Sequence, residues 1–580
     1  MTQDSHWKRT AAAVGVTSLL LAGCGSGGAA DDEAPEVDEE AQGVGAMEDF
    51  SAGDTFVADE PITVSLLYRD HPNYSLQDDW LILEHLEEEH GVTLDPVVTP
   101  LSDFEDRRSV LIGAGEIPDY VPVMWPGHET AYISGGALLA VSDYLDYMPN
   151  FTDKLERWDL QEEFDNLRQD DGKAYILPGL REDPFHNWTL AVRDDIWQDL
   201  GLEDPETWDE LQDQLAQVAE AHPDMIPWSD RWEMNATLNL AGPNFDTAGG
   251  WGLGNSLYYD ADADEFVFTG ATDEYRVMLE YFSGLMEEGL LDTESLTQDD
   301  DSAVQKFASG QSAMISTNEE ELSALRTAFE EIGEDDAEVR MIRVPAGPEG
   351  DNVAAGGRFD VGMVLASHLA DRDDFIAVLQ FLDWLYYSDE GLVFGAWGVE
   401  GETYEINEDG ERELAENVGI KDFNPDAEEH LSVDYGFYNG VFTHNFGSDT
   451  EIFLSLMSDE AVHLQEEMSD KVELPMQPNI PFSELEIEQA SLWQNSLTDQ
   501  VNEATAQFIL GQRDLEDWDS YVAELEARNM ADYVELANEA YQRGQEMLDE
   551  LEEEGDLLDS DAEDSDAEDS DAEDSETEGD

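Results

Sequence analysis

Residues 62–100 read ITVSLLYRDHPNYSLQDDWLILEHLEEEHGVTLDPVVTP, and this stretch decides the fold class. It opens with a largely apolar run, residues 62–68, of the kind that is buried on both faces of a parallel sheet. Residues 78–91 have helical spacing and stop at Gly91, and residues 92–100 are again strand-like. The order strand, helix, strand predicts a βαβ unit.

The same alternation continues beyond residue 100. SDFEDRRSVLIGAGE (102–116) has helical spacing with Ser102 as the expected N-cap, and DYVPVMW (119–125) is a third apolar strand. This alternation predicts a doubly wound α/β sheet. Ligands of such sheets bind beyond the carboxyl ends of the strands, where Trp125 stands.

The composition is strongly acidic. The 580 residues contain 140 Asp and Glu but only 25 Lys and Arg, a net charge of −115. Such a field repels nucleic acid, and at low salt it repels parts of the fold from one another. We therefore expect no nucleic-acid partner and a halophilic protein. Hydrophobic residues still make up 41%, enough for a large core, and the length favours two lobes.

Both ends of the chain differ from its middle. Lys8 and Arg9 precede an apolar run that closes on LAGC (21–24), which predicts a signal peptide over 1–23 and lipidation, for example by palmitate, at Cys24. Cys24 is the only cysteine, so an internal disulfide is excluded. Residues 24–57 are expected as a flexible acidic tether, and 551–580 as a disordered acidic tail.

Seven phrases, in order along the chain, resemble the carbohydrate-binding lipoproteins of extracellular solute-binding protein family 1, which serve ABC importers. They are GAGEIPD, SGGALLAVSDYLD, DGKAYILPG, LGLEDPETWDEL, FASGQSAMIS, AVLQFLDWLYYSDEGLVFGAWGVEGETY and EDWDSYVAELEARNMADYVELANEAY. The resemblance implies a two-lobe periplasmic-binding-protein-like fold of type II, each lobe a doubly wound sheet flanked by helices. We expect the first lobe at 58–185 and 320–390, and the second at 186–319 and 391–550.

The resemblance also implies a function. The protein would be held by lipid on the extracytoplasmic face of the cell membrane and would trap a sugar or oligosaccharide by hinge closure. It would then deliver this ligand to the transmembrane subunits of an ABC permease. A monomer without enzymatic activity, cofactor or metal is expected.

A sugar site needs aromatic rings that stack on the pyranose and polar side chains that bond its hydroxyls. Candidates stand after strands, at the expected crossovers between lobes, and before the phrase GVEG. They are Tyr68, Arg69, Trp125, His128, Glu129, Arg181, Trp188, Trp228, Trp232, Arg358 and Trp397.

Other interpretations stay open. Each tryptophan has an alternative role in core packing, and each arginine in a salt bridge. A receptor for a peptide or another organic solute would use Arg69, Arg181 and Arg358 on carboxylates. A secreted polysaccharide-active enzyme and a structural lipoprotein are further alternatives. YDADADEF (259–266) lacks the glycine and terminal glutamate of a calcium loop, so a hairpin turn is expected there.

Overall fold

Two β-sheets organise the protein in the computed structural model. The structure describes residues 37–554 except 262, 335, 355–357, 408–409, 421–423, 425–426, 443–446, 456 and 475. One sheet has six strands and the other three. Among the helices of these residues, none is both long and apolar enough to cross a membrane.

The six-stranded sheet has the order β16-β4-β11-β3-β1-β2. Its strands are β1 (Ile62–Asp70), β2 (Val92–Pro100), β3 (Tyr120–Met124), β4 (Leu177–Arg181), β11 (Phe359–Leu365) and β16 (Gly447–Ser448). β1 runs parallel to both β2 and β3, and the crossovers contain α2 (Leu81–His90) and α3 (Phe104–Ala114). The predicted βαβ alternation is confirmed. The cap of α3 differs, since Asp103 rather than Ser102 precedes it.

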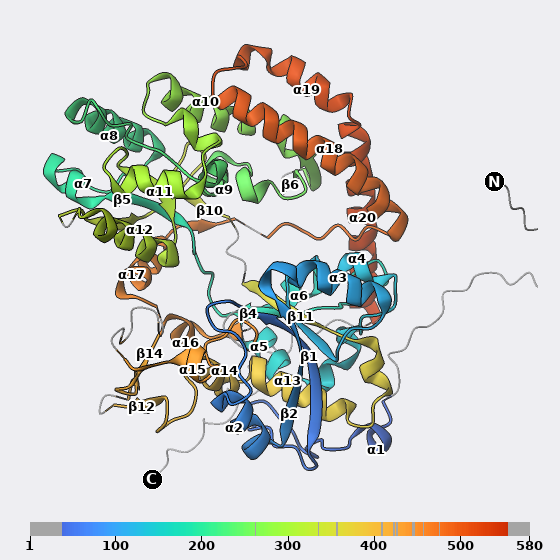
Figure 1. Cartoon of the computed structure of the whole chain (residues 1–580). Helices are drawn as coiled ribbons and strands as arrows, with labels where there is room; N and C mark the ends of the chain where they lie inside the picture. Colours follow the sequence, from blue (N-terminus) through green and yellow to red (C-terminus); the bar gives the residue numbers. More distant parts are fainter. Residues whose placement is uncertain are drawn as a thin grey trace, which may run out of the picture. The chain divides into compact units, whose positions relative to one another are not determined.

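Strands from later in the chain complete this first lobe. β11 lies antiparallel between β3 and β4. Helix α13 (Phe375–Tyr387), buried along its whole length, packs against β1 (Figure 1). Other helices of this lobe are α4 (Thr130–Ile133), α5 (Pro149–Arg157), α6 (Gln161–Asp165) and α14 (Asp389–Trp397). Apolar residues of β1, β3 and β11 form its core with α3.

The second lobe is built on the three-stranded sheet β8-β5-β9. Its central strand is β5 (Thr189–Arg193), and both β8 (Met314–Thr317) and β9 (Val339–Ile342) run antiparallel to it. The helices that share its core are α7 (Asp194–Leu200), α8 (Trp208–Ala221), α9 (Asn235–Ala241), α10 (Asp273–Glu287), α11 (Asp300–Ala308) and α12 (Glu319–Ile332). The expected hairpin near residue 260 is confirmed by β6 (Leu257–Asp260) and β7 (Glu265–Phe268).

C-terminal helices belong to the same core as this second sheet. They are α17 (Asp459–Met468), α18 (Glu484–Ile509), α19 (Trp518–Glu526) and α20 (Met530–Glu554). Figure 1 shows α18, in orange, beside α10, in green, although α10 ends at Glu287 and α18 begins only at Glu484. Helix α20 also packs on β7 of the hairpin.

The pairing of strands moves two of the expected lobe boundaries. β9 pairs with β5, so the chain returns to the first sheet after residue 342 and not at 320. In the other direction, α14 packs on α13, and β16 pairs with β4. Helix α14 and strand β16 therefore belong with the first lobe, because α14 packs on the apolar helix α13 and β16 pairs with β4.

The expected tether also ends earlier than residue 57. Helix α1 (Glu39–Gln42) is capped by Asp38, and Phe56 is fully buried. The carbonyl of Phe56 contacts His90 Nδ1 at 2.6 Å, and Gln380 holds both backbone groups of Met47. Residues 38–57 are thus fixed to the first lobe by polar contacts that their composition does not reveal. Cys24 and most of the expected acidic tail lie outside the described residues, while α20 itself continues to Glu554.

Candidate functional site

Trp125 follows the carboxyl end of β3, in the middle of the first sheet. Its side chain is 49% exposed, which is unusual in a lobe whose other large aromatic residues are mostly buried. Arg69 stands near the carboxyl end of the adjacent strand β1. The parallel pairing of β1 with β3 sets both residues at the same edge of the sheet, as the sequence predicted.

The backbone just before Trp125 is strained. Val123 has φ of +67°, a left-handed conformation that a β-branched residue rarely adopts. Its carbonyl accepts a hydrogen bond of 2.8 Å from Nη1 of Arg108, a buried side chain of α3 that also pairs with Glu105. Strain of this kind persists only where the surroundings hold it, so Arg108 helps to fix the turn that presents Trp125.

Glu129 lies in the turn after Trp125 and is completely buried. Neither of its carboxylate oxygens has a hydrogen-bond partner among the described residues. Burial raises the pKa of Glu129 to about 7, and the backbone of Glu129 and Gly127 lowers it only slightly. His128, next in sequence, is exposed. We call Arg69, Arg108, Val123, Trp125 and Glu129 the strand-end cluster.

Three tryptophans meet in the second lobe. The ring of Trp188 lies 5.0 Å from that of Trp232 and 4.8 Å from that of Trp251, in edge-to-face contact with both. The centroids of Trp232 and Trp251 are 5.5 Å apart. Trp251 is 44% exposed. We call these three residues the tryptophan cluster, and it offers more aromatic surface than the single Trp125.

The segment that carries Trp232 is strained as well. Trp232, Glu233 and Met234 have φ of +52°, +55° and +63°, three consecutive left-handed residues of which none is glycine. Beside them, the buried guanidinium of Arg231 lies 3.7 Å above the Trp232 ring and donates to Glu321 at 2.9 Å. A second carboxylate, that of Asp300, is 3.4 Å away. The guanidinium of Arg231, itself held by these two carboxylates, packs on the face of the Trp232 ring and helps to fix its position.

Sequence reasoning identified Trp188 and Trp232 but missed Trp251. Trp251 stands in AGGWGLG, at the start of a short 3-10 helix, Gly250–Leu253. A large aromatic residue between glycines was the available signal, because such a loop has little core of its own to bury a ring.

Other tryptophan and tyrosine candidates lie in the core. Tyr68 is buried, and its hydroxyl accepts a hydrogen bond of 2.8 Å from Asn439. Trp228 is buried and stacks on Trp208. Trp397 is also buried and donates from Nε1 to Ser455. Packed neighbours cover the rings of these three residues, which is the alternative role in core packing, and a ligand contact by any of them stays a prediction.

Both crossover arginines already have partners. Arg181 pairs with Asp360 and lies over the rings of Phe185 and Phe453. Arg358 donates to the carbonyls of Trp158 and Asp159 and to the Glu163 carboxylate. Each guanidinium is therefore held by the first lobe, which corrects the expectation that it is available to a ligand.

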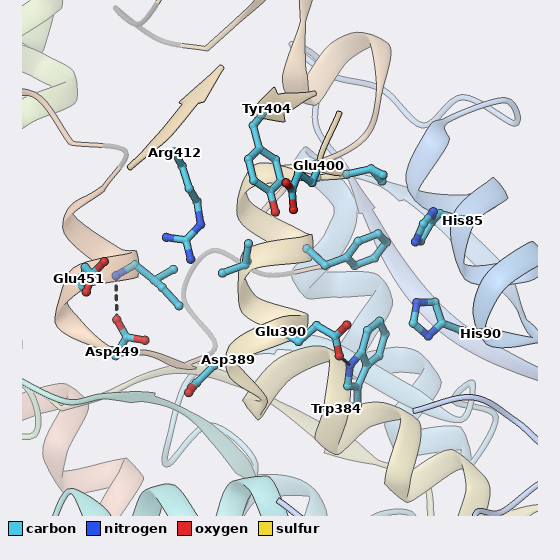
Figure 2. Close-up of a pocket in the computed structure, with 15 residues that line it drawn as sticks. His85, His90, Trp384, Asp389, Glu390, Glu400, Tyr404, Arg412, Asp449 and Glu451 are labelled. Carbon is cyan, nitrogen blue, oxygen red and sulfur yellow. Dashed lines mark hydrogen bonds between the residues drawn. The ribbon is translucent and has the colours of Figure 1, made fainter. Parts of the chain in front are cut away.

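A separate pocket of about 570 Å³ opens in the first lobe. Figure 2 shows His85 and His90 projecting into it from α2, while Glu400 and Tyr404 lie close together nearby. Glu390 accepts a hydrogen bond from Nε1 of Trp384. Its acidic lining residues, Asp389, Glu390, Glu400, Asp449 and Glu451, face a single arginine, Arg412. No residue of the strand-end or tryptophan cluster lines this pocket.

Comparison with known proteins agrees with this fold. The family model for bacterial extracellular solute-binding proteins matches residues 77–390, more than half of the chain. The fructooligosaccharide ABC transporter substrate-binding protein FusA of Streptococcus pneumoniae is 22% identical over 571 residues, 93% of this chain and 98% of FusA. Lipoprotein LipO of Bacillus subtilis is 22% identical over 335 residues, 56% of this chain and 64% of LipO.

Solved structures share the architecture. The crystal structure of an extracellular solute-binding protein from Bifidobacterium longum subsp. infantis superposes with a TM-score of 0.63 at 16% identity. The superposition covers 84% of this chain and 100% of that one. At this identity the likeness shows the fold alone, which is the two-lobe fold that the sequence predicted.

Proposed function

Because the chain belongs to the bacterial extracellular solute-binding protein family, we propose that it captures an oligosaccharide outside the cell and delivers it to an ABC importer. Among the relatives reported above, FusA is described as the substrate-binding protein of a fructooligosaccharide ABC transporter. The observation that carries the proposal is the pairing of exposed tryptophan with strained backbone, which occurs in both lobes.

Sugar recognition explains both clusters. A pyranose or furanose ring presents C–H groups that pack on an indole face, while its hydroxyls need fixed polar partners. The tryptophan cluster supplies the indole surface, and the strand-end cluster supplies Trp125 with charged and polar side chains. In this proposal one ligand contacts both clusters and thereby stabilises the closed form of the two lobes.

Hinge motion would be absorbed by the segments that connect the sheets. The chain passes between the two sheets from β4 to β5, from β9 to β11, and again between β16 and α17. Lipid attachment at Cys24, a monomeric state and delivery to a permease are part of the same proposal. A Cys24→Ser variant expressed in the host should then move from the membrane fraction to the medium.

Intrinsic fluorescence tests the sugar assignment. The protein, kept in molar salt because of its charge of −115, is titrated with a panel of neutral and acidic oligosaccharides and with oligopeptides. We expect a saturable change in emission and a higher melting temperature with one class of saccharide. Response to peptides alone would replace the sugar by a peptide, and recovery of shortened saccharides after incubation would indicate an enzyme.

A further inference from the structure

Arg69 has no acidic partner in a protein that is crowded with acids. The chain contains 140 Asp and Glu for 25 Lys and Arg, so an arginine should find a carboxylate easily. Arg181, Arg231, Arg340 and Arg358 all do so. Within the described part of the chain, the partly buried Arg69 makes neither a hydrogen bond through its side chain nor an ion pair.

The nearest charges leave Arg69 uncompensated. Tyr74 and, more weakly, Glu105 favour its charged form, but the Glu105 carboxylate is already bound by Arg108, and Arg108 itself opposes the charge on Arg69. Burial lowers the pKa of Arg69, although a guanidinium stays protonated throughout the physiological range. Arg69 is therefore a partly buried cation whose neighbouring carboxylate, that of Glu105, is paired with another arginine.

The sequence suggested three arginines that could bind a ligand carboxylate. In the described part of the structure, two of them are held by groups of the protein, and Arg69 is not. Arg181 and Arg358 are held by acidic side chains or backbone carbonyls of the first lobe. Arg69 lies at the carboxyl edge of the sheet, one strand from the exposed ring of Trp125. A planar guanidinium binds a carboxylate through two parallel hydrogen bonds.

We propose that the ligand is an oligosaccharide that contains uronate units, with a carboxylate on Arg69 and a sugar ring on Trp125. This inference rests on the proposed function, because it names the class of saccharide that the same site takes. A neutral saccharide would leave the guanidinium with hydroxyl partners only, which compensate its charge less well.

Because the protein has a large negative net charge, its affinity for an anionic saccharide should depend on salt in a way that its affinity for a neutral saccharide does not. A net charge of −115 repels an anionic saccharide at long range. Salt screens this repulsion, because the Debye length falls to about 3 Å at 1 M salt. A contact pair with the partly buried Arg69 is screened less. Affinity for a uronate should therefore rise from moderate to molar salt, relative to the affinity for the same saccharide without its charge.

Trigalacturonate and its trimethyl ester provide a matched pair of probes, since they differ only in the charge of the three carboxylates and in three methyl groups. Calorimetric titration in molar KCl should give at least about tenfold tighter binding of the free acid, the factor expected for a charge-assisted pair. Arg69→Gln should remove this preference, and it should weaken binding of the free acid at least about tenfold more than binding of the ester. Arg107→Gln removes an exposed charge from the same helix as Arg108 and should preserve it.

Each result decides a different statement. Equal binding of acid and ester, or a preference that survives in Arg69→Gln, overturns the uronate inference. If only neutral saccharides close the lobes, the proposed function stands and the inference about Arg69 fails. If no saccharide of either charge binds, both fail.

Discussion

The strand-end cluster and the tryptophan cluster each hold a tryptophan in a fixed position, but they differ in aromatic surface and in the polar groups beside the ring. Both hold a tryptophan next to left-handed backbone with the help of a buried arginine. In the tryptophan cluster the arginine is paired and the aromatic surface is large. In the strand-end cluster one ring stands beside Arg69 and Glu129, neither of which has a side-chain partner among the residues that the structure describes. The first arrangement suits affinity through contact area, and the second suits discrimination among ligands by charge and hydrogen bonding.

The largest expected effect is on the free energy of unfolding, and it differs between the two buried arginines, Arg231 and Arg108. Arg231→Ala should lower the free energy of unfolding by about 3 kcal/mol, because it strips a buried cation from two carboxylates and a tryptophan ring. Arg108→Ala, which loses one exposed carboxylate and one carbonyl, should cost about 2 kcal/mol. Chemical unfolding in molar salt measures both, and equal losses would contradict the difference between the clusters.

Glu129 gives the strand-end cluster a pH dependence. Because burial raises its pKa from 4.5 to about 7, the folded protein keeps a proton that the unfolded chain releases over this window. Its contribution to stability therefore falls as the pH rises from 4.5 to 7. Glu129→Gln should be more stable than the parent at pH 8 by up to about 3 kcal/mol, and equal to it near pH 4.

Unfolding curves at both pH values check this expectation. Glu116→Gln, which removes an exposed carboxylate from the same lobe, serves as the control and should change little at either pH. A gain that is the same at pH 4 and pH 8 would show that the pKa of Glu129 is the same in the folded and the unfolded protein.

Removing one ring from each cluster compares their contribution to binding. Trp251→Ala should weaken the affinity for the captured saccharide by about 2 kcal/mol, because the exposed ring of an interlocked group is lost. Trp125→Ala should cost about 1 kcal/mol. Trp493→Ala, in α18 and outside both clusters, should bind as the parent does. A larger loss for Trp125 in titration would reverse the assignment of roles.

The smallest effect concerns backbone strain. Glu233 is exposed with φ of +55°, so Glu233→Gly should relieve strain without loss of packing and stabilise the protein by about 1 kcal/mol. Glu233→Ala keeps the strain and is the matched control in thermal unfolding. Val123→Gly should not stabilise, because the buried valine side chain is lost with the strain. If Glu233→Ala stabilises as much as glycine, charge rather than strain is the cause.

Sequence predicted the fold well where the information is local. The alternation over residues 62–125 gives β1, α2, β2, α3 and β3, and with them the position of Trp125 at a strand end. Periodicity shows that a segment buries one face, but it does not say against which partner. For this reason α14 and β16, which depend on distant pairings such as β16 with β4, were assigned to the other lobe.

Roles of single residues were harder to predict for the same reason. Trp228 and Trp232 lie four positions apart, yet one stacks in the core and the other in the tryptophan cluster. The free state of Arg69 depends on Arg108 binding Glu105, and the sequence does not show which of two neighbouring cations takes a carboxylate. The left-handed conformations of Val123 and Glu233 carry no residue signature, since glycine is absent at both positions.

The packing of residues 38–57 on the first lobe has a consequence for the cell surface. If Cys24 carries the lipid, only about 14 residues separate it from the first residue that the lobe holds. At about 3.5 Å per residue, their contour spans at most about 50 Å. Under the proposed function, the lipid would then hold the protein close to the bilayer and confine its search for the proposed permease to two dimensions.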